Sequence, residues 1–264
     1  MIMSDGLRQQ LKSWSTVMQP FIESTAFDSI INTLRTEVQN KKTVIPASSD
    51  MFQVFSKCSM DKVKAVVMMM EPYSILHNGK MNGGIPLDCS GTGISSSTLD
   101  SWYTALEISY GFKVDMDQTL DMSYLLEEGV LLVNCALTTI KDCPGAHQSL
   151  WRPFTEHLIK VINEEYRALP ICLVGTQAQK YEQYIDTSKH YVLCVEHPMV
   201  AISANKRLWN FNNLFRWCNE IIEKINGPES LIQWWKWKQS IPVNNMPPWV
   251  EDRVWDSCVS QLPF

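Results

Sequence analysis

The segment Val63–Ser74, which reads VKAVVMMMEPYS, contains an apolar run that stops at an acid, a proline and a tyrosine. An apolar, partly β-branched run bounded by proline predicts a buried strand that leads into a tight turn. The turn places Glu71 and Tyr73 at the carboxyl end of the strand, where open α/β sheets bind their ligands. We therefore expect both the fold and the candidate site to be organised around this segment.

Further apolar runs predict the other strands of a sheet, and amphipathic or polar segments separate them. The predicted strands cover residues 64–70, 129–135, 170–174 and 191–195. The predicted helices cover residues 7–23, 27–39, 98–108 and 154–167. Each strand is almost continuously apolar, as strands buried on both faces are. The alternation predicts a single α/β domain with a central four-stranded, mostly parallel sheet flanked by helices.

Composition limits the possible classes of protein. The chain has 264 residues, of which 45% are hydrophobic, so it can bury a large core. No apolar run reaches about 18 residues and no leader pattern is visible, so we expect an intracellular protein, cytoplasmic or nuclear, that is not secreted and has no membrane partner. The eight cysteines form no CxxC pair, and neither GxGxxG nor a Walker motif occurs, so no metal site and no cofactor are expected.

The net charge of −5 argues against broad, nonspecific coating of DNA, which requires many Lys and Arg contacts to phosphate. It remains compatible with a focused site that binds one bent or flipped nucleotide while the rest of the surface is acidic.

Polar side chains follow three of the predicted strands. Glu71 follows the first, Asn134 ends the second and His197 follows the fourth. Each residue taken alone is ordinary, because an acid beside proline is commonly a turn residue, and Asn and His often end strands or cap helices. Their joint placement at one edge of a parallel sheet favours a functional site.

A series of motifs, in the same order, resembles those of the uracil-DNA glycosylase family between about Trp14 and Trp234. The family pattern GQDPYH resembles residues 69–74 (MMEPYS), and QGVLLLN…LT resembles residues 128–134 with 137–138. The pattern SH…GW..FT resembles the stretch with His147, Trp151, Phe154 and Thr155. The patterns WG..AQ and HHVL…HPSPLSA resemble residues 175–180 (GTQAQK) and 190–204. The resemblance implies the glycosylase fold for a domain spanning 1–235.

The resemblance also implies a role for each residue of the site. Glu71 would hold the attacking water, and His197 would donate a hydrogen bond to the uracil oxygen as negative charge develops there. Asn134 would read the uracil edge and Tyr73 would exclude the thymine methyl. The predicted base-binding residues are Met70, Tyr73, Leu87 and Asn134, with Leu87 in the place of the family's stacking Phe.

The first motif departs from the family pattern in four of its six residues. Glu71 replaces Asp, and the extra methylene moves the carboxylate by roughly 1 Å, a displacement that can cost ~10²-fold in rate. Met69 and Met70 replace Gly and Gln, and Ser74 replaces His. These changes predict a crowded pocket and a displaced carboxylate.

The loops that would handle DNA are also altered. The predicted DNA-binding residues are Ser96, Ser97, Ile202, Ser203, Lys206 and Arg207. Ile202 is the candidate for the side chain that fills the gap left by a flipped base, while Lys206 and Arg207 are read equally well as phosphate contacts or as solvated loop charges.

Residues 236–264 form a Trp- and Pro-rich extension beyond the family fold. Half of the ten tryptophans of the chain lie from Trp234 onward. The extension either packs back on the domain or docks on a protein partner, and Trp is enriched at the anchoring positions of interfaces.

Two functions remain open from the sequence. The altered motif favours a glycosylase-like, DNA-binding protein that is catalytically impaired or inactive and acts in replication or repair or as a docking module. The retained Asn134, Tyr73 and His197 favour the alternative, an active glycosylase that excises uracil from single- or double-stranded DNA with Glu71 and His197. Whether the chain is an enzyme is therefore undecided at this level.

Overall fold

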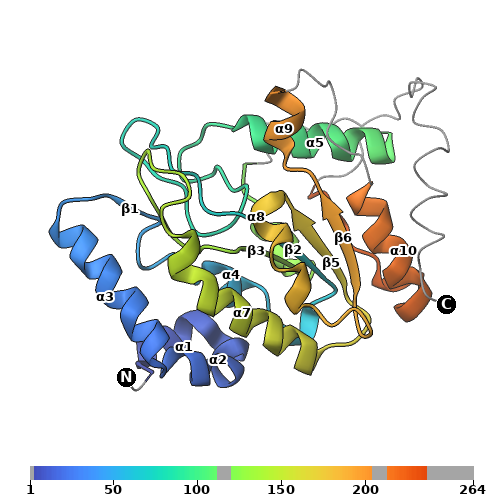
Figure 1. The fold of residues 1–264 in the computed structure, drawn as a ribbon. Helices are drawn as coiled ribbons and strands as arrows, with labels where there is room; N and C mark the ends of the chain where they lie inside the picture. Colours follow the sequence, from blue (N-terminus) through green and yellow to red (C-terminus); the bar gives the residue numbers. More distant parts are fainter. Residues whose placement is uncertain (1–2, 112–119, 204–212, 237–264) are drawn as a thin grey trace.

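The computed structural model describes residues 3–111, 120–203 and 213–236. These residues form one α/β domain around a four-stranded sheet with the strand order β3-β2-β5-β6 (Figure 1). The strands are β2 (Ala65–Met69), β3 (Val130–Asn134), β5 (Pro170–Val174) and β6 (Tyr191–Val195). All three pairings are parallel, so the predicted sheet is confirmed.

The parallel register sets which residues meet at the carboxyl edge of the sheet. β2 pairs with β3 so that Met69 lies opposite Asn134, and β5 pairs with β6 so that Val174 lies opposite Val195. β2, β3 and β5 are buried along their whole length. The segments that leave the four strands therefore emerge side by side at one edge.

Two helical regions show how the local sequence forms the elements. α3 (Thr25–Gln39) begins after Ser24, whose hydroxyl accepts a hydrogen bond from the backbone N–H of Phe27. Phe27, Ile30 and Leu34 are buried at helical spacing. The predicted helix 7–23 is instead three pieces: α1 (Asp5–Leu11), η1 (Lys12–Trp14) and α2 (Ser15–Ile22).

The break in the first helix has a local cause. Lys12 has a φ of 48°, which no α-helix accommodates, so the chain changes direction there. Leu11, Trp14 and Met18 are nevertheless buried, because the same apolar spacing serves all three pieces.

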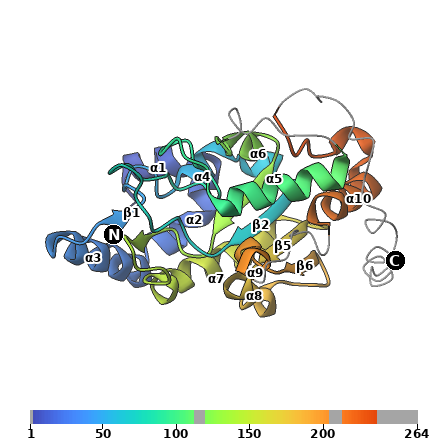
Figure 2. The same ribbon diagram turned by 90° about the horizontal axis from the view of Figure 1, so that it is seen from above.

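The remaining helices connect the strands and cover the sheet. They are α4 (Gln53–Lys57), η2 (Met60–Lys62), α5 (Ser97–Tyr110), α6 (Ser123–Glu127), α7 (Gln148–Glu165), α8 (Thr176–Gln179), η4 (Glu182–Tyr184), α9 (Pro198–Ser203), α10 (Leu214–Asn226) and η5 (Pro228–Ser230). The sheet lies between α7 and α8 on one side and α6 and α10 on the other (Figure 2). Within the described residues, no helix is long and apolar enough to cross a membrane.

A second, two-stranded sheet joins the amino-terminal part of the chain to the segment after β3. β1 (Val44–Ile45) pairs antiparallel with β4 (Thr139–Ile140). Strands of two residues carry no readable alternation, so the sequence did not predict them. This pairing fixes the segment after β3 against the end of α3. The predicted boundary at 235/236 stays a prediction, because 237–264 lie outside the described residues.

Candidate active site

A cavity of about 530 Å³ opens at the carboxyl edge of the sheet, between the segments that follow β2, β3 and β6. Its lining includes eight predicted site residues: Met70, Glu71, Tyr73, Leu87, Ser96, Ser97, Asn134 and His197. The fold thus brings together residues that are up to 127 positions apart, from Met70 to His197. A volume of this size suits a small ring-shaped ligand together with part of its attachment.

Asn134 ends β3 and lies at the inner end of the cavity. The residue is only 2% exposed, and neither its side-chain oxygen nor its side-chain nitrogen has a hydrogen-bond partner among the described residues. Buried amides are normally paired, and an unpaired one costs roughly 1–3 kcal/mol. Asn134 is therefore arranged to pair with a ligand that offers one donor and one acceptor.

His197 follows β6 and lines the same cavity. Its Nδ1 accepts a hydrogen bond from the backbone N–H of Met199 at 3.2 Å, so a neutral ring carries its proton on Nε2. Burial lowers the pKa of His197, which favours this neutral form. Gly175 supports the ring from behind, since a Cβ there would lie 3.0 Å from the Cβ of His197. The imidazole can therefore act as a neutral hydrogen-bond donor.

Glu71 differs from Asn134 because both of its carboxylate oxygens already have protein partners. Oε1 accepts from the backbone N–H of Gly145 at 2.7 Å, and Oε2 accepts from Nε2 of Gln148 at 3.3 Å. Gln148 also donates to the carbonyl oxygen of Met70 at 3.1 Å. The carboxylate is thus tied to the turn before α7. Each oxygen retains a second lone-pair direction that can still hold a water molecule.

Tyr73 and Leu87 form the wall of the cavity. The hydroxyl of Tyr73 lies 2.5 Å from Oγ of Ser96, and burial raises the pKa of Tyr73 above its usual value. Ser96 also caps α5 by accepting from the backbone N–H of Leu99, so the tyrosine is fixed to the start of a helix. Leu87 is buried and has a φ of 64°, a left-handed conformation that is strained for Leu.

The mouth of the cavity is apolar. Ile75, Ile94 and Met199 are exposed and line it, and Oγ of Ser97 contacts Sδ of Met199 at 3.4 Å. The cavity lining given by the described residues contains no Lys or Arg. The sequence did not reveal this rim, because single exposed apolar residues in three separate loops form no pattern along the chain.

Four predicted DNA-binding residues lie outside the described part of the structure, either entirely or with their side chains. Ile202 and Ser203 belong to the backbone of α9, but their side chains are not described, and Lys206 and Arg207 fall within residues 204–212. Among the described residues, no group of three or more His, Cys, Asp or Glu side chains is placed to hold a metal ion.

The sequence also missed four residues that shape the site. Gly145, Gln148, Gly175 and Met199 act through a backbone N–H, a side-chain amide or close packing. Both glycines have positive φ in the structure, a conformation that favours Gly. Gly175 stands in the segment that resembles WG..AQ, but that resemblance did not connect it with His197. Gln148 follows the His147 motif, yet nothing in the sequence connects it with Glu71.

Comparison with known proteins identifies relatives of this arrangement. The chain is 30% identical over 227 residues to a uracil-DNA glycosylase of Bacteroides thetaiotaomicron, covering 84% of this chain and 97% of the relative. It is 30% identical over 217 residues to one of Flavobacterium johnsoniae, covering 80% of this chain and 93% of the relative. The mimivirus uracil-DNA glycosylase structure superposes with a TM-score of 0.74 at 21% identity, covering 84% of this chain and 86% of that one. No protein-family model matches the chain.

Proposed function

The chain belongs to the uracil-DNA glycosylase family, and we propose that it binds an extruded uracil of DNA in the described cavity and hydrolyses its N-glycosidic bond slowly. In this proposal Asn134 reads the base, His197 stabilises the developing negative charge on the uracil oxygen, and Glu71 holds the attacking water. Tyr73 and Leu87 form the walls of the base pocket.

The observation that carries the proposal is the unpaired amide of Asn134 in the same cavity as the neutral imidazole of His197. The uracil edge offers an imide N–H donor and a carbonyl acceptor, which match the two free atoms of a buried amide. A neutral Nε2–H donor in the same cavity suits an oxygen that gains negative charge during bond cleavage.

The expected low rate rests on the other end of the cavity. Glu71 is one methylene longer than the Asp of the family pattern, so its carboxylate reaches a different point in the cavity. Ser74 stands in the place of the family's His. A misplacement of about 1 Å can cost ~10²-fold in rate, so we expect turnover at least ~10²-fold below that of a family enzyme with the unaltered motif.

A second candidate is base binding without hydrolysis. It is favoured by the two protein contacts to Glu71, since a carboxylate held by Gly145 and Gln148 in a displaced position would not bring a water molecule to the reacting carbon. The noncatalytic protein would still recognise uracil through Asn134, so binding and cleavage must be measured separately.

The test is a single-turnover assay of uracil release from a single-stranded and a duplex oligonucleotide, with binding to the same DNA measured by fluorescence anisotropy. We expect slow release by the wild-type chain and at least tenfold slower release by Glu71→Gln and by His197→Ala. Turnover at ordinary family rates would disprove the impairment. Uracil-specific binding without any release would select the second candidate, and binding without preference for uracil would reject both.

A further inference from the structure

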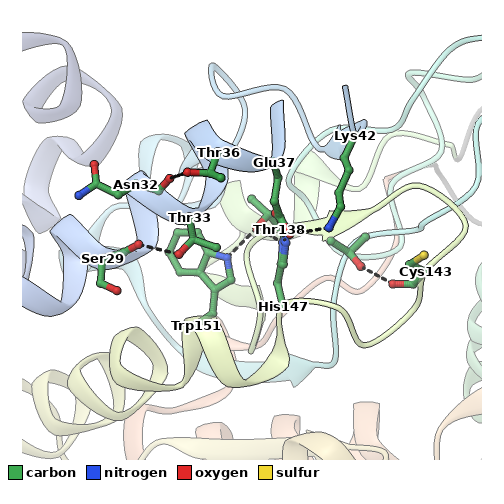
Figure 3. A network of polar contacts seen from close by, with 11 residues as sticks. Ser29, Asn32, Thr33, Thr36, Glu37, Lys42, Thr138, Cys143, His147 and Trp151 are labelled. Atoms are coloured by element: carbon green, nitrogen blue, oxygen red, sulfur yellow. Dashed lines mark hydrogen bonds and ion pairs between the residues drawn. The ribbon is translucent and has the colours of Figure 1, made fainter. Parts of the chain in front are cut away.

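The segment between β4 and α7 connects the amino-terminal helix α3 to the carboxylate of Glu71. Figure 3 shows a continuous set of polar contacts that runs from Lys42 and Glu37 through His147 to Thr138 and Trp151. The site described above uses none of these groups. The network includes His147, which lies between the two residues that donate to the Glu71 carboxylate, Gly145 and Gln148.

The centre of this network is a buried imidazole. Nε2 of His147 lies 2.7 Å from Oε2 of Glu37, and Nδ1 lies 2.8 Å from Oγ1 of Thr138. The side chain of His147 is 2% exposed and that of Glu37 is 16% exposed. Lys42 lies 3.4 Å from the other carboxylate oxygen of Glu37, at the surface end of the network.

The hydrogen-bond directions follow from counting donors. Nε1 of Trp151 donates to Oγ1 of Thr138 at 2.7 Å. The buried Thr138 hydroxyl then satisfies its own proton by donating to Nδ1 of His147, its acceptor among the described residues. His147 consequently donates from Nε2 to Glu37. Every polar atom of this chain has a partner, so the ring is held in one orientation.

The orientation of His147 is transmitted to Glu71 by its sequence neighbours. Gly145 and Gln148, which flank His147 at the start of α7, provide the two donors to the Glu71 carboxylate. Because His147 lies between them within one turn, displacement of its ring would move both donors. Glu71 has no other hydrogen-bond partner given by the described residues.

A second contact fixes the same segment to the motif turn. The backbone N–H of Asp142 donates to the carbonyl oxygen of Ser74 at 2.9 Å. The pairing of β4 with β1 holds this segment against the end of α3, close to Glu37. The segment is thus restrained by α3 on one side and contacts the Glu71–Ser74 turn on the other.

We propose that Glu37, His147 and Gln148 are positioning residues that set the location of the Glu71 carboxylate in the cavity. The expected effect of these residues on kcat rests on the proposed function, whereas their effect on the position of the carboxylate does not. Gln148 holds the carboxylate directly, and the buried Glu37–His147–Thr138 chain holds the turn from which Gln148 and the Gly145 N–H donate. The Glu71 carboxylate, one methylene longer than the family's Asp, is thereby anchored by Gly145 and Gln148.

The experiment compares His147→Leu, Gln148→Leu and Glu37→Leu with the conservative variant Glu37→Gln. We expect the three Leu variants to lower kcat at least tenfold while KM changes less than twofold, because Asn134 and Tyr73 are untouched. Glu37→Gln keeps an oxygen that accepts from His147 and should stay within threefold of wild type. The exchange rate of the Gly145 amide, measured by NMR, should rise at least tenfold in His147→Leu, because its bond to Glu71 is loosened.

Asn219→Leu is the matched control. Asn219 accepts from the backbone N–H of Ile232 at 2.9 Å and donates to its carbonyl at 3.0 Å and to the Tyr110 hydroxyl at 3.3 Å, so its removal also breaks partly buried hydrogen bonds, outside the cavity lining. It should lower the thermal midpoint as His147→Leu does, with kcat and Gly145 exchange unchanged.

Two results would overturn the inference: unchanged Gly145 exchange in His147→Leu, or equal changes in His147→Leu and Asn219→Leu. If the wild-type chain releases no uracil, the proposed function fails, while the Gly145 exchange rates still decide whether this network positions Glu71.

Discussion

The two ends of the cavity are built on opposite principles. At the base-reading end, Asn134 is buried with both amide atoms unpaired, and His197 presents a neutral Nε2–H. At the water-activating end, both oxygens of Glu71 are bonded to Gly145 and Gln148. The amide of Asn134 is therefore free to form hydrogen bonds with a ligand, whereas the carboxylate of Glu71 already accepts hydrogen bonds from the protein.

This difference separates two proposed tasks of the site, binding of the base by Asn134 and positioning of the water by Glu71. A buried unpaired amide destabilises the free protein, and a ligand that pairs with it would remove that cost. A carboxylate with protein partners contributes to stability by itself. In the proposed function, the free amide of Asn134 would recognise the base, while the position of the attacking water would depend on the contacts of Glu71 with Gly145 and Gln148.

The largest expected effect comes from replacing Asn134, whose side-chain amide is unpaired. Asn134→Leu removes the amide that reads the base, and we expect kcat/KM for uracil-DNA to fall ~10³-fold, because the donor and the acceptor of the uracil edge would each be left unpaired at a cost of roughly 1–3 kcal/mol. The same change should raise the free energy of unfolding by about 1 kcal/mol, since it removes an unpaired buried polar group. Kinetics and urea denaturation measure the two. A loss of stability would show that Asn134 has a partner in the free protein.

A smaller effect is expected from shortening the carboxylate. Glu71→Asp restores the residue of the family pattern, and the resemblance alone would predict a faster enzyme. The structure predicts the reverse, a fall in kcat of about tenfold, because a carboxylate withdrawn by roughly 1 Å loses the Gly145 and Gln148 donors. Single-turnover kinetics decide between them. A rise in kcat would mean that the turn before α7 restrains Glu71 away from the water.

The smallest effect concerns pH. Burial lowers the pKa of His197 from its ordinary value of 6.5, so the neutral donor persists as the pH falls through 6.5. We expect kcat/KM to stay constant from pH 8 to below 6.5 and to fall only when the imidazole takes up its proton. His197→Gln should remove that fall. A decline already centred above pH 6.5 would contradict the lowered pKa.

Thermal stability does not isolate this titration. The pKa of His190 is lowered by burial as well, so both rings bind protons more readily in the unfolded chain. Both therefore contribute stability that is present above the unfolded pKa and is lost as the pH falls. The pH dependence of the rate is the sharper measurement, because it reports the ring that lines the cavity.

The sequence predicted the four strands, because runs buried on both faces are continuously apolar and end at turn residues. It also predicted that Glu71, Asn134 and His197 meet, because carboxyl ends of parallel strands share one edge. It could not predict the break at Lys12. It also could not predict strands β1 and β4, because a strand of two residues is too short to show an alternating pattern. The sequence also could not predict the apolar rim of the cavity or the contacts of Gln148, because both involve segments that are distant along the chain.

The sheet, the site edge and the three polar side chains placed there were determined by the sequence itself, since these depend on local periodicity and on the residues at the end of each strand. Only the tertiary structure decided how those side chains are used. Asn134 is unpaired because no group of the described residues bonds its amide, and Glu71 is held because Gly145 and Gln148, more than 70 residues after it, donate to its carboxylate. Hydrogen-bond satisfaction is a property of neighbours in space, and no spacing along the chain encodes it.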